Sequence, residues 1–218
     1  MALPELDREK QLAAEAAALL VEDGMTVGLG TGSTVAYLLP ALAARRLDLR
    51  CVATSAWTEE RGRSLGLRIE PFDRLERLDI AIDGADQIAP SGWLVKGGGG
   101  AHTREKIVVA ASDRFVVIAS HDKLVDEISP PVPLELLRYG LAATLRALAP
   151  VELRDAPPSP DGGVIADYLG PVGDPAELDA RLSGVPGVVG HGLFPPELVH
   201  EVLVGRGDTV ESLRPAGR

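Results

Sequence analysis

A run of four glycines at residues 97–100 constrains this chain more than any other feature of its sequence. The run lies in the segment LVKGGGGAHTREKIVV, residues 94–109, with Lys96 directly before it and Glu105 shortly after it. Consecutive glycines carry no side chains and tolerate positive φ, so the backbone can approach a ligand closely and turn several N–H groups toward one anion. The alternative interpretation is a flexible surface turn, because glycine runs are common in loops.

A second glycine turn, GTGST at residues 30–34, separates a predicted strand at 25–29 from a predicted helix at 35–47. Strand, glycine turn and helix form the arrangement of a phosphate site, because the helix N-terminus and the free backbone favour an anion. The turn is not a GxGxxG dinucleotide fingerprint, since Val35 takes the place of the last glycine, and no Gly-Lys-Ser/Thr makes it a P-loop. A plain glycine turn capped by Ser or Thr explains these residues equally well.

Two aspartates, Asp83 and Asp86, follow a predicted apolar strand at residues 79–82 in the sequence DGAD. Ligands bind at the carboxyl ends of the strands in open α/β sheets, so both carboxylates are candidate site residues. Their alternative role is to cap a turn, which Asp does often. We expect no metal site, because no third acidic residue stands at a suitable spacing for magnesium and the histidine pattern does not indicate zinc.

The carboxyl ends of several predicted strands should meet at one sheet edge. Further strands are predicted at residues 49–53, 67–70 and 115–119, and helices at 5–22 and 58–65. Successive strand ends should bring GTGST, Thr54 with Ser55, DGAD, and Lys96 with its glycines to this edge. The strand at 115–119 should add Lys123. This convergence favours a binding site over a set of unrelated turns.

Charge and composition narrow the possible partners. The net charge of −10 argues against nucleic acid, whose phosphate backbone requires a basic surface. No apolar run reaches the length of a membrane span. The single cysteine, Cys51, cannot form an internal disulfide, which favours a reducing cytoplasm. Only four of the 22 basic residues are lysine, and three of these lie between positions 96 and 123, where they can offer local positive charge.

The second half of the chain has a different organisation. Residues 129–133, SPPVP, are interpreted as a rigid linker. Helices are predicted at 133–149 and 174–182, and strands at 151–154, 164–169, 188–193 and 199–204. The mixture of short strands and helices indicates a small α+β domain packed on the first one. The last strand is expected to return to the main sheet.

Taken together, GLGTGST (28–34), DGAD (83–86), KGGGGAHTREKIV (96–108) and Lys123 resemble the ribose-5-phosphate isomerase family of the A type. The tail PGVVGHGLF (186–194) fits the second domain of that family, so the resemblance covers nearly the whole chain. It implies an α/β fold in which a Rossmann-like open sheet carries a smaller α+β, ferredoxin-like domain. The implied boundaries are 1–128, completed by about 198–218, for the catalytic domain and 129–197 for the small one.

The resemblance also implies an activity. The family consists of metal-free aldose–ketose isomerases that need no cofactor and interconvert D-ribose 5-phosphate and D-ribulose 5-phosphate in the pentose phosphate pathway. A cytoplasmic homo-oligomer, a dimer or tetramer, is expected, with a sugar phosphate as its partner and neither nucleic acid nor a membrane.

The resemblance assigns roles residue by residue. Glu105 matches the catalytic base, and Lys96, Asp83 and Asp86 are the other expected catalytic residues. The expected substrate-binding residues are Thr31, Gly32, Ser33, Thr34, Asp83, Gly84, Ala85, Asp86, Lys96, Gly97, Gly98, Gly99 and Lys123. One carboxylate can remove the proton from C2 and return it to C1 through a cis-enediolate, while a cation or N–H groups stabilise the oxyanion.

Three positions depart from the family pattern: Gln87 stands where Glu is usual, His102 replaces Leu, and Asp122 replaces Ser. Asp122 is expected to neutralise part of the charge of Lys123.

Two alternative functions remain. A non-catalytic sugar-phosphate-sensing domain of a transcription regulator is disfavoured by the retained Glu105 and by the absence of a recognisable DNA-binding segment. A CoA-transferase-like enzyme would need a glutamate that forms a thioester.

Overall fold

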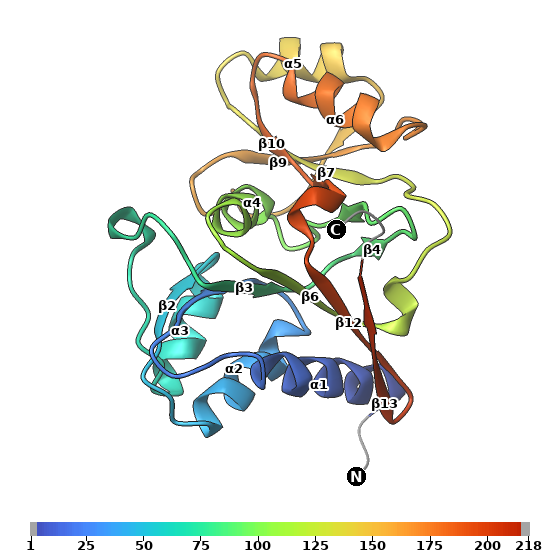
Figure 1. The fold of residues 1–218 in the computed structure, drawn as a ribbon. Helices are drawn as coiled ribbons and strands as arrows, with labels where there is room; N and C mark the ends of the chain where they lie inside the picture. The colour runs from blue at the N-terminus through green and yellow to red at the C-terminus, as the bar shows by residue number, and fades with distance from the viewer. Residues whose placement is uncertain (1–3, 215–218) are drawn as a thin grey trace.

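A six-stranded sheet forms the larger part of the molecule, which is known from a computed structural model describing residues 4–214. The strand order is β13-β12-β6-β3-β1-β2 (Figure 1). The strands are β1 (Thr26–Leu29), β2 (Arg50–Ala53), β3 (Ile80–Asp83), β6 (Phe115–Ser120), β12 (Glu201–Arg206) and β13 (Thr209–Leu213). All neighbours pair in parallel except β13, which forms an antiparallel hairpin with β12. The predicted open α/β sheet and the return of the last strand to it are confirmed.

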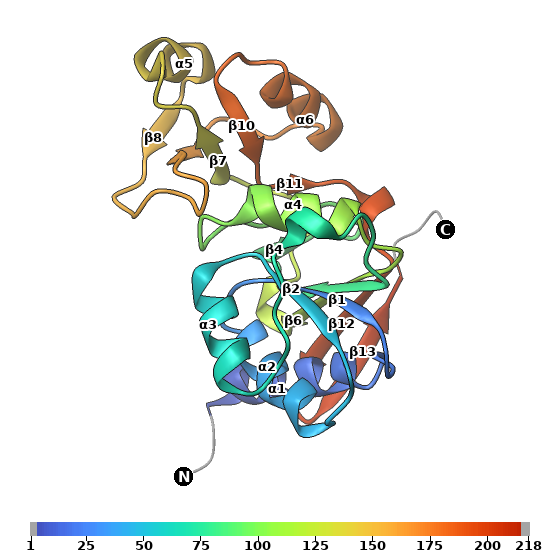
Figure 2. The same ribbon diagram turned by 90° about the vertical axis from the view of Figure 1, so that its left-hand side faces the viewer.

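Helices cover both faces of this sheet, as the alternation of side chains along a strand requires. Val116 and Ile118 of β6 pack with α1 (Glu5–Ala18) and α2 (Val35–Ala44) on one face. Phe115 and Val117 pack on the other face with α4 (His102–Ala110). The helix α3 (Ala56–Ser64) lies beside β2. Figure 2 shows α4 between the large sheet below it and the second part of the molecule above it.

A four-stranded antiparallel sheet, in the order β10-β7-β9-β8, forms that second part. Its elements are β7 (Val132–Leu136), α5 (Leu141–Leu148), β8 (Val151–Leu153), β9 (Val164–Tyr168), α6 (Pro175–Ser183) and β10 (Val188–His191). Strand, helix, two strands, helix and strand is the ferredoxin-like order. The expected class of this part is therefore correct, whereas the domain boundaries at 128/129 and 197/198 stay predictions.

The helix predicted at residues 133–149 is wrong in its first half. Residues 132–136 form β7, a central strand whose five residues are all buried between β10 and β9. Gly140 then adopts a left-handed conformation (φ +72°) and the helix begins only at Leu141. Pairing with two neighbouring strands outweighs the helical pattern here. It also shortens the predicted linker, because β7 already begins at Val132.

The strand before the glycine loop belongs to a small third sheet, which differs from the prediction. This sheet consists of β4 (Gln87–Ile88), β5 (Leu94–Val95) and β11 (Leu193–Phe194), in the order β11-β5-β4. The strand that precedes Lys96 therefore lies outside the large sheet, because it pairs with β4 and β11 instead. Two other predictions were also inaccurate. Residues 67–70 contribute only an isolated bridge between Ile69 and Cys51, and residues 188–193 divide between β10 and β11.

Three short 3-10 helices complete the elements: η1 (Phe72–Arg74), η2 (His121–Lys123) and η3 (Pro196–Leu198). Within residues 4–214, none of the helices has the length and apolarity needed to cross a membrane.

Candidate active site

A cavity of about 240 Å³ opens at the carboxyl ends of β1 and β3. β1 and β3 are neighbours in the large sheet. The chain order reverses at β1, because β2 lies on one side of β1 and β3 lies on the other side. Such a switch point is where open α/β sheets bind ligands. The cavity is lined by Thr31, Gly32, Ser33, Thr34, Gly84, Ala85, Asp86, Lys96, Gly97, Gly98, Gly99, Glu105 and Lys123.

The ammonium group of Lys96 lies between two carboxylates at one end of this cavity. Its Nζ atom is 2.8 Å from Oδ2 of Asp83 and 3.2 Å from Oε2 of Glu105. It also donates a hydrogen bond to the carbonyl oxygen of Gly84. All three charged side chains are only 3% exposed, so solvent does little to screen them. We call Lys96 and Glu105, together with Asp83 beneath them, the carboxylate end of the cavity.

Burial and charge shift the pKa values of the three side chains at the carboxylate end. Burial raises the pKa of Glu105 to about 8, assisted by the negative charge of Asp83 and opposed by the ammonium of Lys96. Burial likewise raises the pKa of Asp83, although Lys96 opposes the shift. For Lys96, burial alone would lower the pKa, but the attraction of Asp83 and Glu105 outweighs it and the pKa rises. Lys96 therefore stays charged, and Glu105 is a stronger base than an exposed glutamate.

Asp83 is the one expected substrate-binding residue that does not line the cavity. It is 2% exposed, and its Oδ1 atom accepts hydrogen bonds from the backbone N–H groups of Thr31 (3.0 Å) and Gly84 (2.7 Å). A Cβ atom on Gly30 would come within 1.8 Å of the Asp83 carboxyl group, so only glycine permits this approach. Asp83 thus ties the GTGST turn to Lys96 from beneath the cavity.

Three other groups fix the glycine loop. The Oδ2 atom of Asp86 accepts a hydrogen bond from the N–H of Gly98 at 2.8 Å. Arg154 donates from Nη1 to the carbonyl oxygens of Gly97 (3.1 Å) and Gly98 (2.9 Å). His102 packs its ring against Gly97, whose φ of +104° favours glycine. Arg154 follows β8 in the second part of the molecule, and no sequence pattern predicted its contact with this loop.

Other lining residues of the cavity come from the start of α2 and from η2. Thr34 is the N-cap residue of α2 but its side chain makes no capping hydrogen bond, so the hydroxyl is not committed to the helix. Lys123 is 36% exposed in its side chain and forms an ion pair with Asp122 at 3.3 Å. The expected neutralisation of Lys123 by Asp122 therefore has a structural basis. We call Ser33, Thr34 and Lys123 the helix end of the cavity.

No cluster of three or more His, Cys, Asp or Glu side chains within residues 4–214 is arranged to hold a metal ion. The ammonium of Lys96 takes the position between the two buried carboxylates that a cation would otherwise fill.

The other two departures from the family pattern, Gln87 and His102, have structural roles. Gln87 exchanges hydrogen bonds with the backbone of Ser129 (2.8 and 2.9 Å), and burial lowers the pKa of His102 to about 4, which leaves it neutral.

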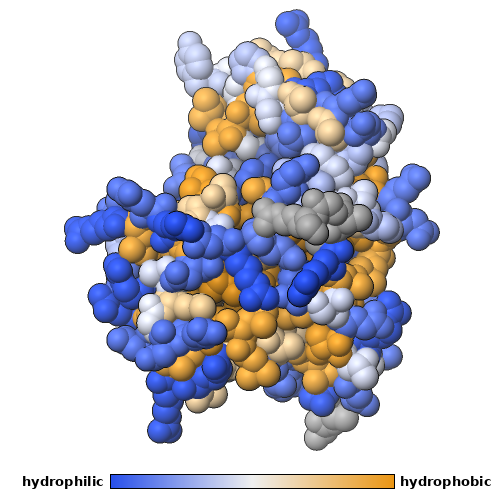
Figure 3. Space-filling view, viewed as in Figure 1, coloured by the Kyte–Doolittle hydropathy of each residue, from blue (hydrophilic) through white to orange (hydrophobic). Residues whose placement is uncertain are grey.

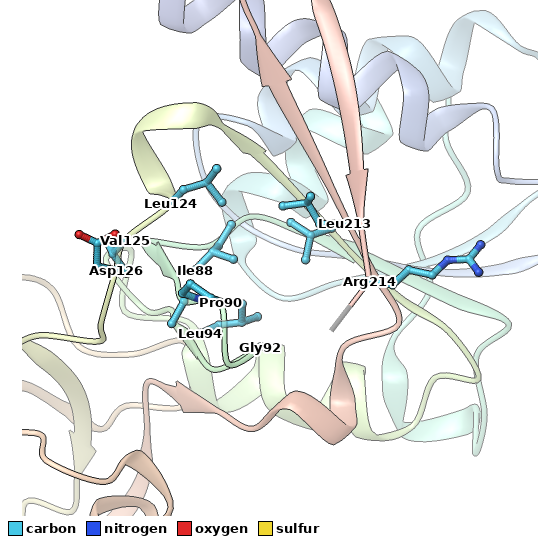
Figure 4. Close-up of a pocket in the computed structure, with 11 residues that line it drawn as sticks. Ile88, Pro90, Gly92, Leu94, Leu124, Val125, Asp126, Leu213 and Arg214 are labelled. Atoms are coloured by element: carbon cyan, nitrogen blue, oxygen red, sulfur yellow. The ribbon is translucent and has the colours of Figure 1, made fainter. Parts of the chain in front are cut away.

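A larger cavity of about 400 Å³ lies between the small sheet and the β12–β13 hairpin (Figure 4). Apolar side chains, among them Ile88, Leu94, Leu124 and Leu213, form most of its wall. Among residues 4–214, the charged residues that line it are Asp126 and Arg214. It therefore lacks the clustered donors that a sugar phosphate needs, and the smaller polar cavity is the candidate active site.

Comparisons with known proteins show which family the chain resembles. The sequence pattern of the family ribose 5-phosphate isomerase A (phosphoriboisomerase A) matches residues 50–209. A ribose-5-phosphate isomerase A of Caulobacter sp. (strain K31) is 45% identical over 224 residues, covering 96% of this chain and 99% of the relative. Ribose 5-phosphate isomerase A from Neisseria gonorrhoeae has a TM-score of 0.92 at 29% identity, covering 97% of this chain and 98% of that one. A D-ribose-5-phosphate isomerase in complex with phospho-erythronic acid has a TM-score of 0.90 at 31% identity, covering 97% and 100%.

Proposed function

This chain belongs to the ribose 5-phosphate isomerase A family, and from that premise we propose that it interconverts D-ribose 5-phosphate and D-ribulose 5-phosphate in the pentose phosphate pathway. The observation that carries the proposal is the buried pair of Glu105 and Lys96, 3.2 Å apart, at one end of a polar cavity. A base and a fixed cation side by side are the two groups that an aldose–ketose isomerisation requires.

Glu105 moves the proton in this mechanism. Its carboxylate removes the proton from C2 of the open-chain aldose and returns it to C1. The proton of the C2 hydroxyl group passes to the oxygen on C1, so that the carbonyl group moves from C1 to C2 through a cis-enediolate. A pKa of about 8 suits a group that must both accept and release a proton near neutral pH. The ammonium of Lys96 stabilises the negative charge that develops on the sugar oxygens, and Asp83 holds Lys96 in place.

The helix end holds the phosphate in this proposal. Ser33 and Thr34 offer hydroxyl groups at the N-terminus of α2, where the helix dipole favours an anion. Lys123 supplies a positive charge that the chain as a whole, with its net charge of −10, does not provide. Asp86, which also lines the cavity, is the residue that we expect to handle the proton of a sugar hydroxyl during ring opening. A relative bound to phospho-erythronic acid, a phosphorylated acid, supports a site that takes a phosphate group.

The direct test is to measure ribulose 5-phosphate formation from ribose 5-phosphate with purified protein in EDTA. Turnover that persists in EDTA supports a metal-free isomerase. Binding of ribose 5-phosphate without turnover would instead favour the sensing domain, for which the relatives named above give no support. Loss of activity that one divalent metal restores would contradict the assignment of Lys96 as the cation.

We also propose that the protein is a cytoplasmic homo-oligomer. Cys51 is free and buried, as expected for a protein of a reducing compartment. Figure 3 shows apolar residues gathered over the region that α1 and α2 occupy in Figure 1. A groove there is lined by Leu19, Tyr37 and Pro40 among others, and Leu19 is 72% exposed, which suits a subunit contact. Light scattering coupled to size-exclusion chromatography would give the oligomeric state.

A further inference from the structure

A buried carboxylate on the first helix contacts the turn that carries Lys123. Glu9 lies on α1 and is only 1% exposed. Its Oε2 atom accepts hydrogen bonds from the backbone N–H of His121 at 3.2 Å and lies 2.7 Å from Nδ1 of the same residue. Its Oε1 atom accepts a hydrogen bond from the N–H of Gly207 at 2.7 Å. One side chain therefore joins three segments that are far apart in the sequence.

The close approach of α1 to β12 depends on Gly205. Gly205 of β12 pairs with Ser120, the last residue of β6, directly before η2 begins. A Cβ atom on Gly205 would meet the backbone oxygen of Glu9 at 2.1 Å, so a larger residue would push α1 away. The helix packs against β6, β12 and η2. The packing thus brings Glu9 against the start of the turn.

The charge of Glu9 is kept by these contacts. Burial alone would raise its pKa, but the hydrogen bonds from Gly207 and His121 outweigh burial and hold the pKa below its usual range. An ionised carboxylate accepts stronger hydrogen bonds than a neutral amide. Glutamine at this position has only one acceptor oxygen, so either Gly207 or His121 would lose its acceptor.

In η2 itself, the side chain of Asp122 accepts a hydrogen bond from Oγ of Ser120, the last residue of β6. Lys123 is the last residue of η2, and its own ion pair is with the neighbouring Asp122. On the far side, Leu124 forms a bridge with Ile88 of β4. Glu9 is therefore the buried group that fixes the first residue of the turn, while β4 fixes the residue that follows it.

We infer that Glu9 is a positioning residue for substrate binding: through His121 it holds η2 so that the ammonium of Lys123 faces the cavity. This inference rests on the proposed role of Lys123 in binding the phosphate group. Glu9 does not line the cavity and takes no part in proton transfer. Its loss should therefore weaken binding and leave the chemical step unchanged.

The test is a double-mutant cycle with Glu9→Gln and Lys123→Ala, measured by steady-state kinetics with ribose 5-phosphate. Glu9→Gln should raise KM about three- to tenfold, as expected for a lost charge-assisted hydrogen bond, with kcat within about twofold of the wild type. In the Lys123→Ala background the same change should raise KM less than about twofold, because the group that Glu9 positions is gone. Equal factors in both backgrounds, or an unchanged KM in the wild-type background, would overturn the inference.

Two further variants keep the test decisive. Glu5→Gln is the matched control, because Glu5 is an exposed residue of the same helix outside the groove proposed as a subunit contact, and its KM should equal that of the wild type. If Glu9→Gln does not fold, His121→Ala removes the ring contact but keeps both backbone hydrogen bonds to Glu9. It should then raise KM about twofold with Lys123 present and have no effect without it. A KM equal to that of the wild type would overturn the inference.

A binding measurement separates this inference from the proposed function. Calorimetric titration with inorganic phosphate needs no turnover. If the wild type binds phosphate through Lys123 but does not isomerise ribose 5-phosphate, the proposed activity fails, while weaker phosphate binding by Glu9→Gln still supports the positioning role. Phosphate affinity that is unchanged by Glu9→Gln, in a wild type whose affinity depends on Lys123, would contradict the role of Glu9 alone.

Discussion

The two ends of the cavity use lysine in different ways. At the carboxylate end, Lys96 is 3% exposed and contacts two buried carboxylates, so each charge there depends on the others. At the helix end, Lys123 is 36% exposed and its ion pair with Asp122 is partly screened by solvent. Removing one member of a buried set leaves uncompensated charge, whereas removing an exposed lysine mainly removes an attraction. The first end should therefore control chemistry and stability together, and the second should control affinity.

The largest expected effect is on kcat, from Glu105→Gln. The amide keeps the shape of the side chain but cannot accept the proton from C2, and loss of a general base lowers rates about 10²–10⁴-fold. KM should change little, because the helix end is intact. Stopped assays at saturating ribose 5-phosphate would measure this, with circular dichroism to check folding. A kcat within about threefold of the wild type would remove Glu105 from the mechanism.

The next effect concerns stability and compares the two lysines directly. Lys96→Met leaves Asp83 and Glu105 buried without their cation, which should lower the free energy of unfolding by about 3–5 kcal/mol. Lys123→Met is the matched control and should lower it by less than about 1 kcal/mol. Urea denaturation of both variants at neutral pH gives the difference. Equal losses for the two variants would mean that the ends do not differ in the way that burial indicates.

The pH dependence of kcat/KM should reflect the carboxylate end. Glu105 acts as a base only when ionised, and its pKa is raised to about 8. Activity should therefore fall about tenfold per pH unit below 8 and reach a plateau above it. In Lys123→Ala, kcat/KM should begin to fall at the same pH, because Lys123 does not contact Glu105 in the cavity. If kcat/KM of the wild type fell only below pH 5, the pKa of the carboxylate would be unshifted, which would contradict the electrostatic account.

The smallest of these effects is on affinity. Lys123→Ala should raise KM for ribose 5-phosphate roughly tenfold, since a hydrogen bond to a charged group contributes about 1.5–3 kcal/mol. Lys123→Arg should restore affinity only in part, because a planar guanidinium replaces a compact ammonium. Ribose without the phosphate should be a poor substrate whose use hardly changes in Lys123→Ala. An equal loss for both substrates would place Lys123 in the chemistry or the fold.

Local sequence patterns were sufficient for much of the large sheet and of the cavity. The strand-turn-helix at GTGST, the DGAD turn and the glycine loop were predicted as neighbours, and all three contribute lining residues. GTGST and DGAD follow parallel strands that end at a common edge, so their meeting needed no knowledge of tertiary contacts, whereas the glycine loop follows a strand of the small third sheet. The position of Asp83 could not be predicted without knowledge of tertiary contacts. Whether a carboxylate at a strand end faces the ligand or lies beneath it depends on Gly30, which comes from another strand end.

Long-range pairing accounts for what the sequence could not show. The segment before Lys96 was expected in the large sheet, but Val95 pairs with Leu193, a residue nearly a hundred positions away. Residues 133–136 were expected to be helical, yet both neighbours of β7 come from later in the chain. Arg154 contacts the glycine loop 57 residues before it, with no local pattern to indicate this. In each case the partner, and not the segment itself, determines the structure.

The most direct test of the central claim, that Glu105 moves the proton between C2 and C1, is solvent isotope incorporation measured by NMR. Ribose 5-phosphate is incubated with the protein in D₂O for many turnovers, and deuterium is measured at C1 of ribulose 5-phosphate and C2 of ribose 5-phosphate. A carboxylic acid exchanges its proton with solvent, so label should accumulate at both carbons in the wild type and in Lys123→Ala, and not in Glu105→Gln. Incorporation of deuterium by Glu105→Gln at the rate of the wild type would show that another group moves the proton and would contradict the account.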